Sequence, residues 1–166
     1  MIIKAILYGG IIAGTIDVGA ACLIYGVSPP IVLRSIASGL IGQAAFSGGA
    51  ATALLGLLLQ WAMSILIAAL YVAATARLAH MRQRWILTGL IAGVIIFFVM
   101  NYVVVPLSAD PSRPKLNLPS LMAVFTPLKF LANMAAMILF GVIIAFFARH
   151  IPWGSSTRGS PVRPVT

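Results

Sequence analysis

Acidic residues are almost absent from this sequence, which has only Asp17 and Asp110 among its 166 residues. Cysteine is equally scarce: Cys22 stands alone, which excludes an internal disulfide and a cysteine-based metal site. The two histidines, at positions 80 and 150, are not spaced as a metal-binding pair. No nucleophile–base pair and no phosphate-binding loop is recognisable. We therefore expect no cofactor, no bound metal and no enzymatic activity.

Apolar side chains take the place of the missing charges. Hydrophobic residues make up 61% of the chain and charged residues 8%, which is outside the range of soluble domains. Several apolar runs reach the roughly eighteen residues needed to cross the hydrocarbon core of a bilayer as a helix. The polar stretches 108–120 and 149–166 are too short to bury a core of their own. We expect one transmembrane domain over residues 1–148 and a disordered cytoplasmic tail at 149–166.

The apolar runs predict an all-α bundle of four transmembrane helices. We place these spans at about residues 2–24, 50–76, 86–106 and 128–147. Between the first two spans, Ser28 followed by Pro29 is typical of a helix start and predicts a short helix over about 31–47. Arg34 makes that segment a poor span, so we expect it to lie in the interface or to re-enter the bundle.

Small residues recur at four-residue spacing inside the spans, a pattern typical of helix–helix contacts rather than of lipid-facing surfaces. In the second span this spacing gives a small, polar stripe: Thr52, Gly56, Gln60 and Ser64. Six glycines are the expected packing positions: Gly10, Gly14, Gly56, Gly89, Gly93 and Gly141.

Asp17 interrupts the first apolar run, which we read as an uncleaved helix rather than a signal peptide. A carboxylate inside a span costs roughly 2.5–3.5 kcal/mol and is tolerated when it faces the bundle interior and has partners. At about 1.5 Å per residue, Asp17 and Asn101 lie about 21 and 22 Å from the same end, and Asn133 reaches a similar level. Gln60 lies nearer the midplane, and Arg34 is on the same side as this polar layer.

We expect Asp17 to pair with Arg34 or to hydrogen-bond with Asn101 and Asn133. Such a buried polar cluster, with Gln60 as a further member, can bind a cation, pass a proton or hold a headgroup. Interhelical hydrogen bonds that only fix helix register are the other interpretation, and they are worth about 0.6 kcal/mol on average. For the amides the structural interpretation is favoured, whereas for Asp17 the two interpretations are balanced.

The net charge of +9 comes from basic residues that flank the apolar runs, which indicates topology and anionic headgroups rather than nucleic acid. With four spans, the side that holds both termini has seven basic residues: Lys4, Arg77, Arg82, Arg84, Arg149, Arg158 and Arg163. The other side has four: Arg34, Arg113, Lys115 and Lys129. This imbalance predicts both termini in the cytoplasm. The three arginines at 77–84 are the candidate lipid-headgroup contacts.

Three segments carry a resemblance to known proteins: residues 14–17 (Gly-Thr-Ile-Asp), residues 36–49, and 99–102 (Val-Met-Asn-Tyr) leading to 106–108 (Pro-Leu-Ser). Together they resemble a group of small bacterial inner-membrane proteins of unassigned function. The stretch 85–107 also resembles the YagU-type inner-membrane proteins, although it lacks the longer loop of that group. The resemblance implies a bacterial inner membrane and four spans, and it brings no catalytic or binding residue with it.

The resulting hypothesis is a small, non-catalytic, multi-pass membrane protein. It acts either as an accessory or assembly subunit that packs on larger partners through its glycines, or as an oligomeric transporter- or channel-like protein with a polar layer around Asp17. The alternative is a lipid-interacting protein, or a membrane-embedded enzyme, that acts on a headgroup through Arg34 and the polar layer. We expect membrane lipids as partners, together with a homo-oligomer or a larger membrane protein, and no nucleic acid.

Overall fold

A computed structural model describes residues 2–109 and 127–151 of the chain. The predicted tail beyond Ile151 lies outside the described residues. So do one acidic residue and four of the basic residues counted above: Asp110, Arg113, Lys115, Arg158 and Arg163.

Four long helices dominate the described chain. They are α1 (Ile2–Tyr25), α4 (Gly49–Arg77), α6 (Trp85–Val99) with its π-helical continuation η1 (Met100–Val104), and α8 (Pro127–Arg149). Three shorter helices connect them: α2 (Pro29–Ile41), α3 (Ala44–Ser47) and α5 (Ala79–Gln83). With α6 and η1 taken together, each of the four is long and apolar enough to cross a membrane, and no strand occurs in the described ranges. The predicted all-α membrane bundle is confirmed, and the chain is a multi-pass membrane protein.

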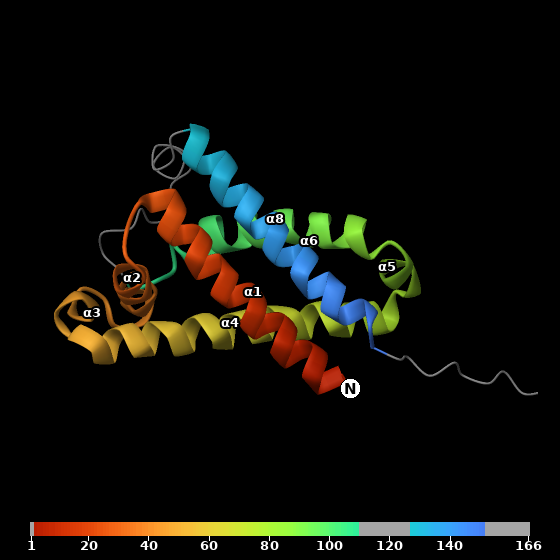
Figure 1. Ribbon diagram of the computed structural model, residues 1–166, viewed down its shortest axis with the longest axis horizontal. Helices are drawn as coiled ribbons and strands as arrows, with labels where there is room; N and C mark the ends of the chain where they lie inside the picture. The colour runs from red at the N-terminus through yellow and green to blue at the C-terminus, as the bar shows by residue number, and fades with distance from the viewer. Residues whose placement is uncertain (1, 110–126, 152–166) are drawn as a thin grey trace, which may run out of the picture.

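The four spans do not follow chain order in their packing. Helix α8 has its most extensive contacts with α6 and α1, and α1 in turn packs against α4. Figure 1 shows α1 and α8 side by side, crossing over α4 and α6. The N-terminus, α5 and the last turn of α8 lie at one end of the molecule, called here the α5 end. Helices α2 and α3 and the first turn of α8 lie at the other, the α2 end.

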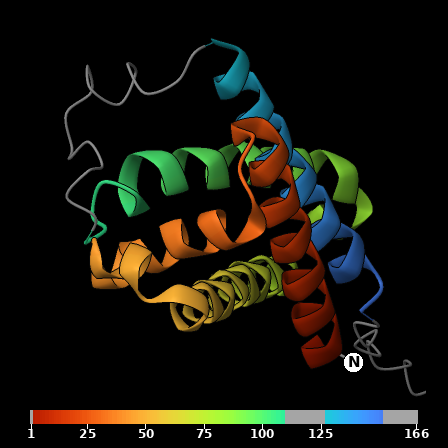
Figure 2. The same cartoon turned by 60° about the vertical axis from the view of Figure 1, so that its left-hand side comes forward.

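The segment between α1 and α4 differs from the single helix predicted over 31–47. Gly42 breaks it into α2 and α3, because its φ of 63° is a left-handed conformation that glycine adopts without strain. Ser28 precedes α2 as predicted, but its side chain makes no capping hydrogen bond. Helix α2 crosses α4 rather than running alongside it, as Figures 1 and 2 show from two directions. The backbone N–H of Ala109 donates to the backbone oxygen of Gly39 at 2.9 Å. This hydrogen bond connects α2 to the segment that follows η1.

The main apolar core lies where α1, α4 and α8 meet, toward the α5 end. Ala68 and Val72 of α4 and Ile144 and Ala148 of α8 are each at most 4% exposed there. Tyr71 belongs to the same core, and its hydroxyl lies 2.8 Å from the Thr88 hydroxyl, which links α4 to α6. The α5 end is therefore closely packed, and α4 and α6 approach each other through this polar contact.

The six glycines predicted as packing positions all lie where another helix comes close. A Cβ atom on Gly10 would be 2.7 Å from the Ile65 backbone, and one on Gly89 would be 2.9 Å from the Ala145 side chain. The remaining four meet neighbouring helices at similar or shorter range: Gly14 at Ser64, Gly56 at Leu33, Gly93 at Ile138 and Gly141 at Gly89 and Gly93. These contacts hold α1 against α4, α2 against α4, and α6 against α8.

Candidate functional site

The candidate site is centred on Asp17 and Gln60, which face each other across the contact between α1 and α4. The Gln60 Nε2 atom donates to the Asp17 carboxylate at 2.9 Å and lies 3.3 Å from the backbone oxygen of Gly14. Both side chains are half-buried. Gly14 permits this geometry, since a side chain there would collide with Ser64 of α4. One amide thus satisfies a side-chain and a backbone acceptor on α1.

Two further polar contacts support the pair. Ser64 is 1% exposed, and its hydroxyl donates to the Gln60 backbone oxygen at 2.7 Å, within α4. The Trp61 indole N–H donates to the Thr15 hydroxyl at 3.1 Å, which is a second side-chain hydrogen bond from α4 to α1. Thr15 and Trp61 were not among the predicted site residues, although Thr15 lies two residues before Asp17 and Trp61 follows Gln60 in the sequence.

Arg34 does not pair with Asp17. Its Nε atom donates to the backbone oxygen of Gly49 at 3.1 Å, so the side chain fastens α2 to the first turn of α4. No ion pair joins Arg34 and Asp17 in the part of the chain that the structure describes. The expectation of an Asp17–Arg34 pair was wrong, because the Arg34 side chain reaches Gly49 at the start of α4, whereas Asp17 meets α4 at Gln60, three turns further along.

Asn101 and Asn133 form a separate contact between η1 and α8. The Asn133 Nδ2 atom lies 3.4 Å from the Asn101 Oδ1 atom, and Asn101 donates to the backbone oxygen of Phe97 at 2.8 Å. Neither amide hydrogen-bonds with Asp17 among the described residues, contrary to expectation. Asn101 lies in the π-helical turn, which apolar periodicity did not predict and which is a feature often found at functional positions.

The predicted polar layer is therefore three local contacts: Asp17 with Gln60, Arg34 with Gly49, and Asn101 with Asn133. Counting residues along each helix gave similar depths for Asp17, Asn101 and Asn133. Because α1 crosses α4 at an angle, however, residues at the same depth do not have to be neighbours (Figure 1). Asp17 is left with a neutral amide as its partner and with no cationic partner in the described ranges.

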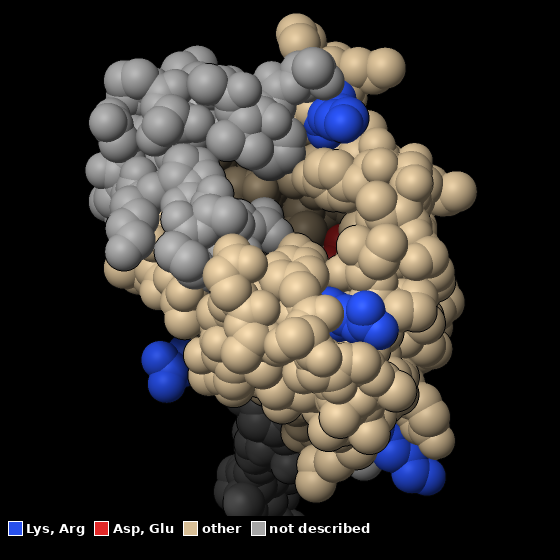
Figure 3. Space-filling model, turned by 90° about the vertical axis from the view of Figure 1, so that its left-hand side faces the viewer, with Lys and Arg blue, Asp and Glu red and all other residues tan. Residues whose placement is uncertain are grey.

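Asp17 is partly exposed and lies in the half of α1 nearer the α2 end. In Figure 3, which views that end, the red of an acidic side chain shows inside a recess, with basic side chains elsewhere on the same face. Asp17 is the only acidic residue in ranges 2–109 and 127–151. At about 1.5 Å per residue, it lies about 12 Å below the end of α1 at Tyr25.

The chemistry available at this site is that of one carboxylate. The described residues contain no group of three or more His, Cys, Asp or Glu side chains that could hold a metal ion. A lone carboxylate with an amide neighbour can accept a proton or contribute one charged ligand to a cation. Ionisable groups inside spans that line proton and ion pathways are of this kind.

The three candidate headgroup arginines differ in their surroundings. Arg82 donates to the Thr75 backbone oxygen at 2.8 Å. The exposed side chains of Arg77 and Arg84 make no hydrogen bond, ion pair or ring contact with described residues. Arg149 of α8 reaches the same end and stacks over the Trp85 ring at 4.3 Å.

Comparison with known proteins gives no matching family model, no similar curated protein and no similar solved structure. The resemblance to bacterial inner-membrane proteins therefore stays an expectation.

Proposed function

We propose that the chain is a small, non-catalytic membrane protein of the transporter or channel type, in which Asp17 binds a proton or a cation in transit. The observation that carries this proposal is the Asp17 carboxylate held between two spans by the neutral Gln60 amide, with no basic partner among the described residues. A carboxylate at this depth is costly, and a register contact does not require one, because Asn101 and Asn133 join helices without charge.

The recess at the α2 end supports the proposal, since a transported ion needs a route from water to the carboxylate (Figure 3). The absence of a carboxylate or thiolate cluster in the described ranges favours a proton or a monovalent cation over a divalent one. Divalent cations such as Ca²⁺ take six to eight oxygen ligands.

The accessory-subunit hypothesis has less support. It depended on glycine surfaces that larger partners would cover, and the six glycines are covered by helices of the same chain. The headgroup hypothesis built on Arg34 is also weakened, because Arg34 is engaged with the Gly49 backbone. A homo-oligomer or a larger partner stays a prediction, to be measured by native mass spectrometry of the gently extracted protein.

We also propose that the α5 end faces the cytoplasm of a bacterial inner membrane. Among described residues this end has five basic side chains: Lys4, Arg77, Arg82, Arg84 and Arg149. The α2 end has two: Arg34 and Lys129. An excess of Lys and Arg next to spans is typical of the cytoplasmic side.

The deciding experiment is ion flux in vesicles that contain the purified full chain. Proton movement is followed with a trapped pH dye, and Na⁺ and K⁺ uptake with cation-selective dyes. We expect flux of one of these ions, reduced to the level of protein-free vesicles in Asp17→Asn, which keeps the size of the side chain and an acceptor for Gln60. Asn133→Leu is the matched control and should retain flux. Unchanged flux in Asp17→Asn, or no flux in the wild type, overturns the proposal.

A further inference from the structure

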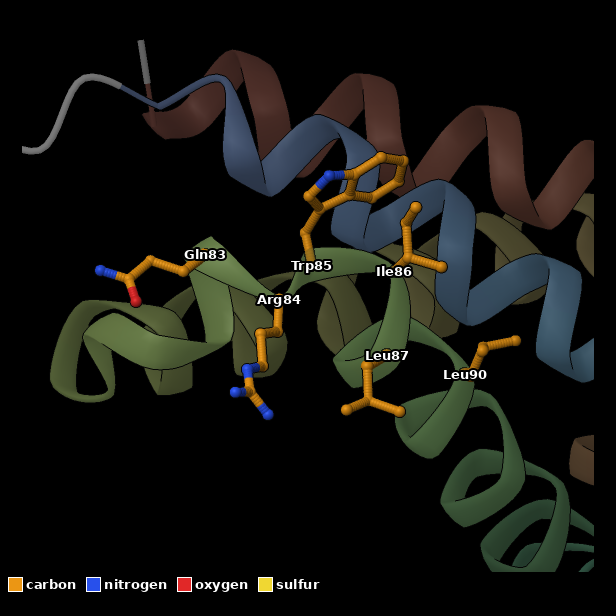
Figure 4. Close-up of a pocket in the computed structure, with 6 residues that line it drawn as sticks. All are labelled: Gln83, Arg84, Trp85, Ile86, Leu87 and Leu90. Carbon is orange, nitrogen blue, oxygen red and sulfur yellow. The ribbon is translucent and has the colours of Figure 1, made fainter.

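A surface pocket of about 450 Å³ lies where α5 bends into α6. It is lined by Gln83, Arg84, Trp85, Ile86, Leu87 and Leu90. The bend occurs at Arg84, whose φ of −109° and ψ of 43° are not helical, so α5 turns away and leaves the first turn of α6 uncovered. Figure 4 shows the Arg84 and Leu87 side chains pointing to the same side of the ribbon, with the Trp85 ring on the other side.

The pocket lies at the start of a span, where we expect the boundary between headgroups and hydrocarbon. Trp85 stacks with Arg149 at the start of α6, and an aromatic ring with a basic partner at a span end is typical of the interface. At about 1.5 Å per residue, Leu87 and Leu90 lie about 4.5 and 9 Å further along α6 than Arg84. A guanidinium is therefore followed by two exposed leucines in the order in which a phospholipid presents its phosphate and its acyl chain.

The charge of this end selects an anionic ligand. The Arg84 guanidinium has no hydrogen-bonding or charged partner among the described residues, and no acidic side chain lies at the α5 end in ranges 2–109 and 127–151. A guanidinium matches a phosphodiester because its N–H groups can donate to two phosphate oxygens at once.

We infer that the α5–α6 bend binds one anionic phospholipid, with the phosphodiester at Arg84 and an acyl chain against Leu87 and Leu90. This site goes beyond the proposed ion function and lies at the opposite end from Asp17, so the two can fail independently. The apolar lining below Arg84 makes the ligand a lipid rather than a free phosphate, which would leave the leucines uncovered.

The test is native mass spectrometry of the delipidated full chain in detergent, titrated with phosphatidylglycerol or with phosphatidylcholine of the same acyl chains. One basic residue near an anionic headgroup changes affinity by about fivefold. We expect the first phosphatidylglycerol to bind about fivefold more tightly than the first phosphatidylcholine. Arg84→Gln should abolish this preference, and Arg84→Lys should retain most of it.

Arg77→Gln is the matched control, because Arg77 is an exposed arginine of the same end that does not line the pocket. Its preference for phosphatidylglycerol should equal that of the wild type. The inference is overturned by equal affinity for the two lipids in the wild type, or by the same loss in Arg77→Gln and Arg84→Gln. It is also overturned if excess glycerophosphoglycerol, which is the phosphatidylglycerol headgroup without acyl chains, displaces the bound lipid.

Discussion

Gln60 and Asp17 are joined across the α1–α4 contact by a 2.9 Å hydrogen bond from the amide to the carboxylate. This bond connects the only acidic side chain among the described residues to the polar stripe of α4. Because Gly14 beside it lets the two helices come close, the position of the carboxylate is set by both spans and not by α1 alone.

The first prediction is that Asp17 and Gln60 are energetically coupled. Hydrogen bonds between membrane helices give coupling energies of about 0.6 kcal/mol on average and up to about 1.7 kcal/mol. A double-mutant cycle of Asp17→Ala and Gln60→Ala, measured by reversible unfolding in mixed micelles, should fall in that range. The cycle of Asp17→Ala with Asn133→Ala should give additive effects within about 0.5 kcal/mol. Equal coupling in the two cycles would contradict the pairing described here.

A second prediction concerns the glycines. Gly93→Ala should destabilise the bundle, because its Cβ would press on Ile138 and Met137 of α8, and overpacking of this kind costs about 1–3 kcal/mol. Gly19→Ala is the control: nothing lies within 4 Å of the added Cβ, and alanine is the better helix former by about 1 kcal/mol. Thermal unfolding in detergent should therefore shift the two variants in opposite directions. A lower unfolding temperature in both variants would show that close packing of α6 against α8 is not the reason for glycine at position 93.

Much of the fold was predictable because spans are specified by local composition. A run of about twenty apolar residues has few alternatives to a transmembrane helix. Gly26, which follows the last residue of α1, and Gly49, which is the first residue of α4, both have positive φ. Small residues face neighbouring helices because only they allow the helices to come close. These properties belong to each segment separately, so the sequence reveals them.

The candidate site was predictable only in part, because depth along a helix does not determine its neighbour. Asp17, Asn101 and Asn133 were placed at similar depths, but Asn133 of α8 meets Asn101 of η1, whereas Asp17 of α1 meets α4. The partner of Asp17 is therefore Gln60, which the count had placed nearer the midplane. Nothing local in the sequence indicates the π-helical turn at Met100–Val104 or the crossing of α2 over α4.

The third prediction is the sidedness of the chain. Ser47 at the α2 end and Gln83 at the α5 end are both exposed, and Cys22→Ala provides a cysteine-free background. In spheroplasts, a membrane-impermeant maleimide should label Ser47→Cys and leave Gln83→Cys unlabelled until the membrane is opened. The reverse pattern would place the basic α5 end outside and refute the proposed orientation.

The fourth prediction concerns the link between α4 and α6 at the α5 end. The Tyr71 hydroxyl lies 2.8 Å from that of Thr88, and Thr88 is also 3.0 Å from the Met81 backbone oxygen. Tyr71→Phe removes one hydrogen bond and should cost about 0.5–1.5 kcal/mol. Thr88→Val should lower the free energy of unfolding by more than this, because it leaves the Tyr71 hydroxyl without its partner. Tyr71 is only 8% exposed, so water does not readily replace that partner.

The two substitutions should not add. Once Tyr71→Phe has removed the Tyr71 hydroxyl, Thr88→Val no longer leaves a buried hydroxyl of α4 without a hydrogen-bond partner. The double variant should therefore be no less stable than Thr88→Val alone. Thr88→Ser keeps the hydroxyl and serves as the control, with stability close to the wild type in the same unfolding assay. Additive losses would mean that the two hydroxyls act independently, and that α4 and α6 are held together at this end by the apolar core around Val72 and Ile144 instead.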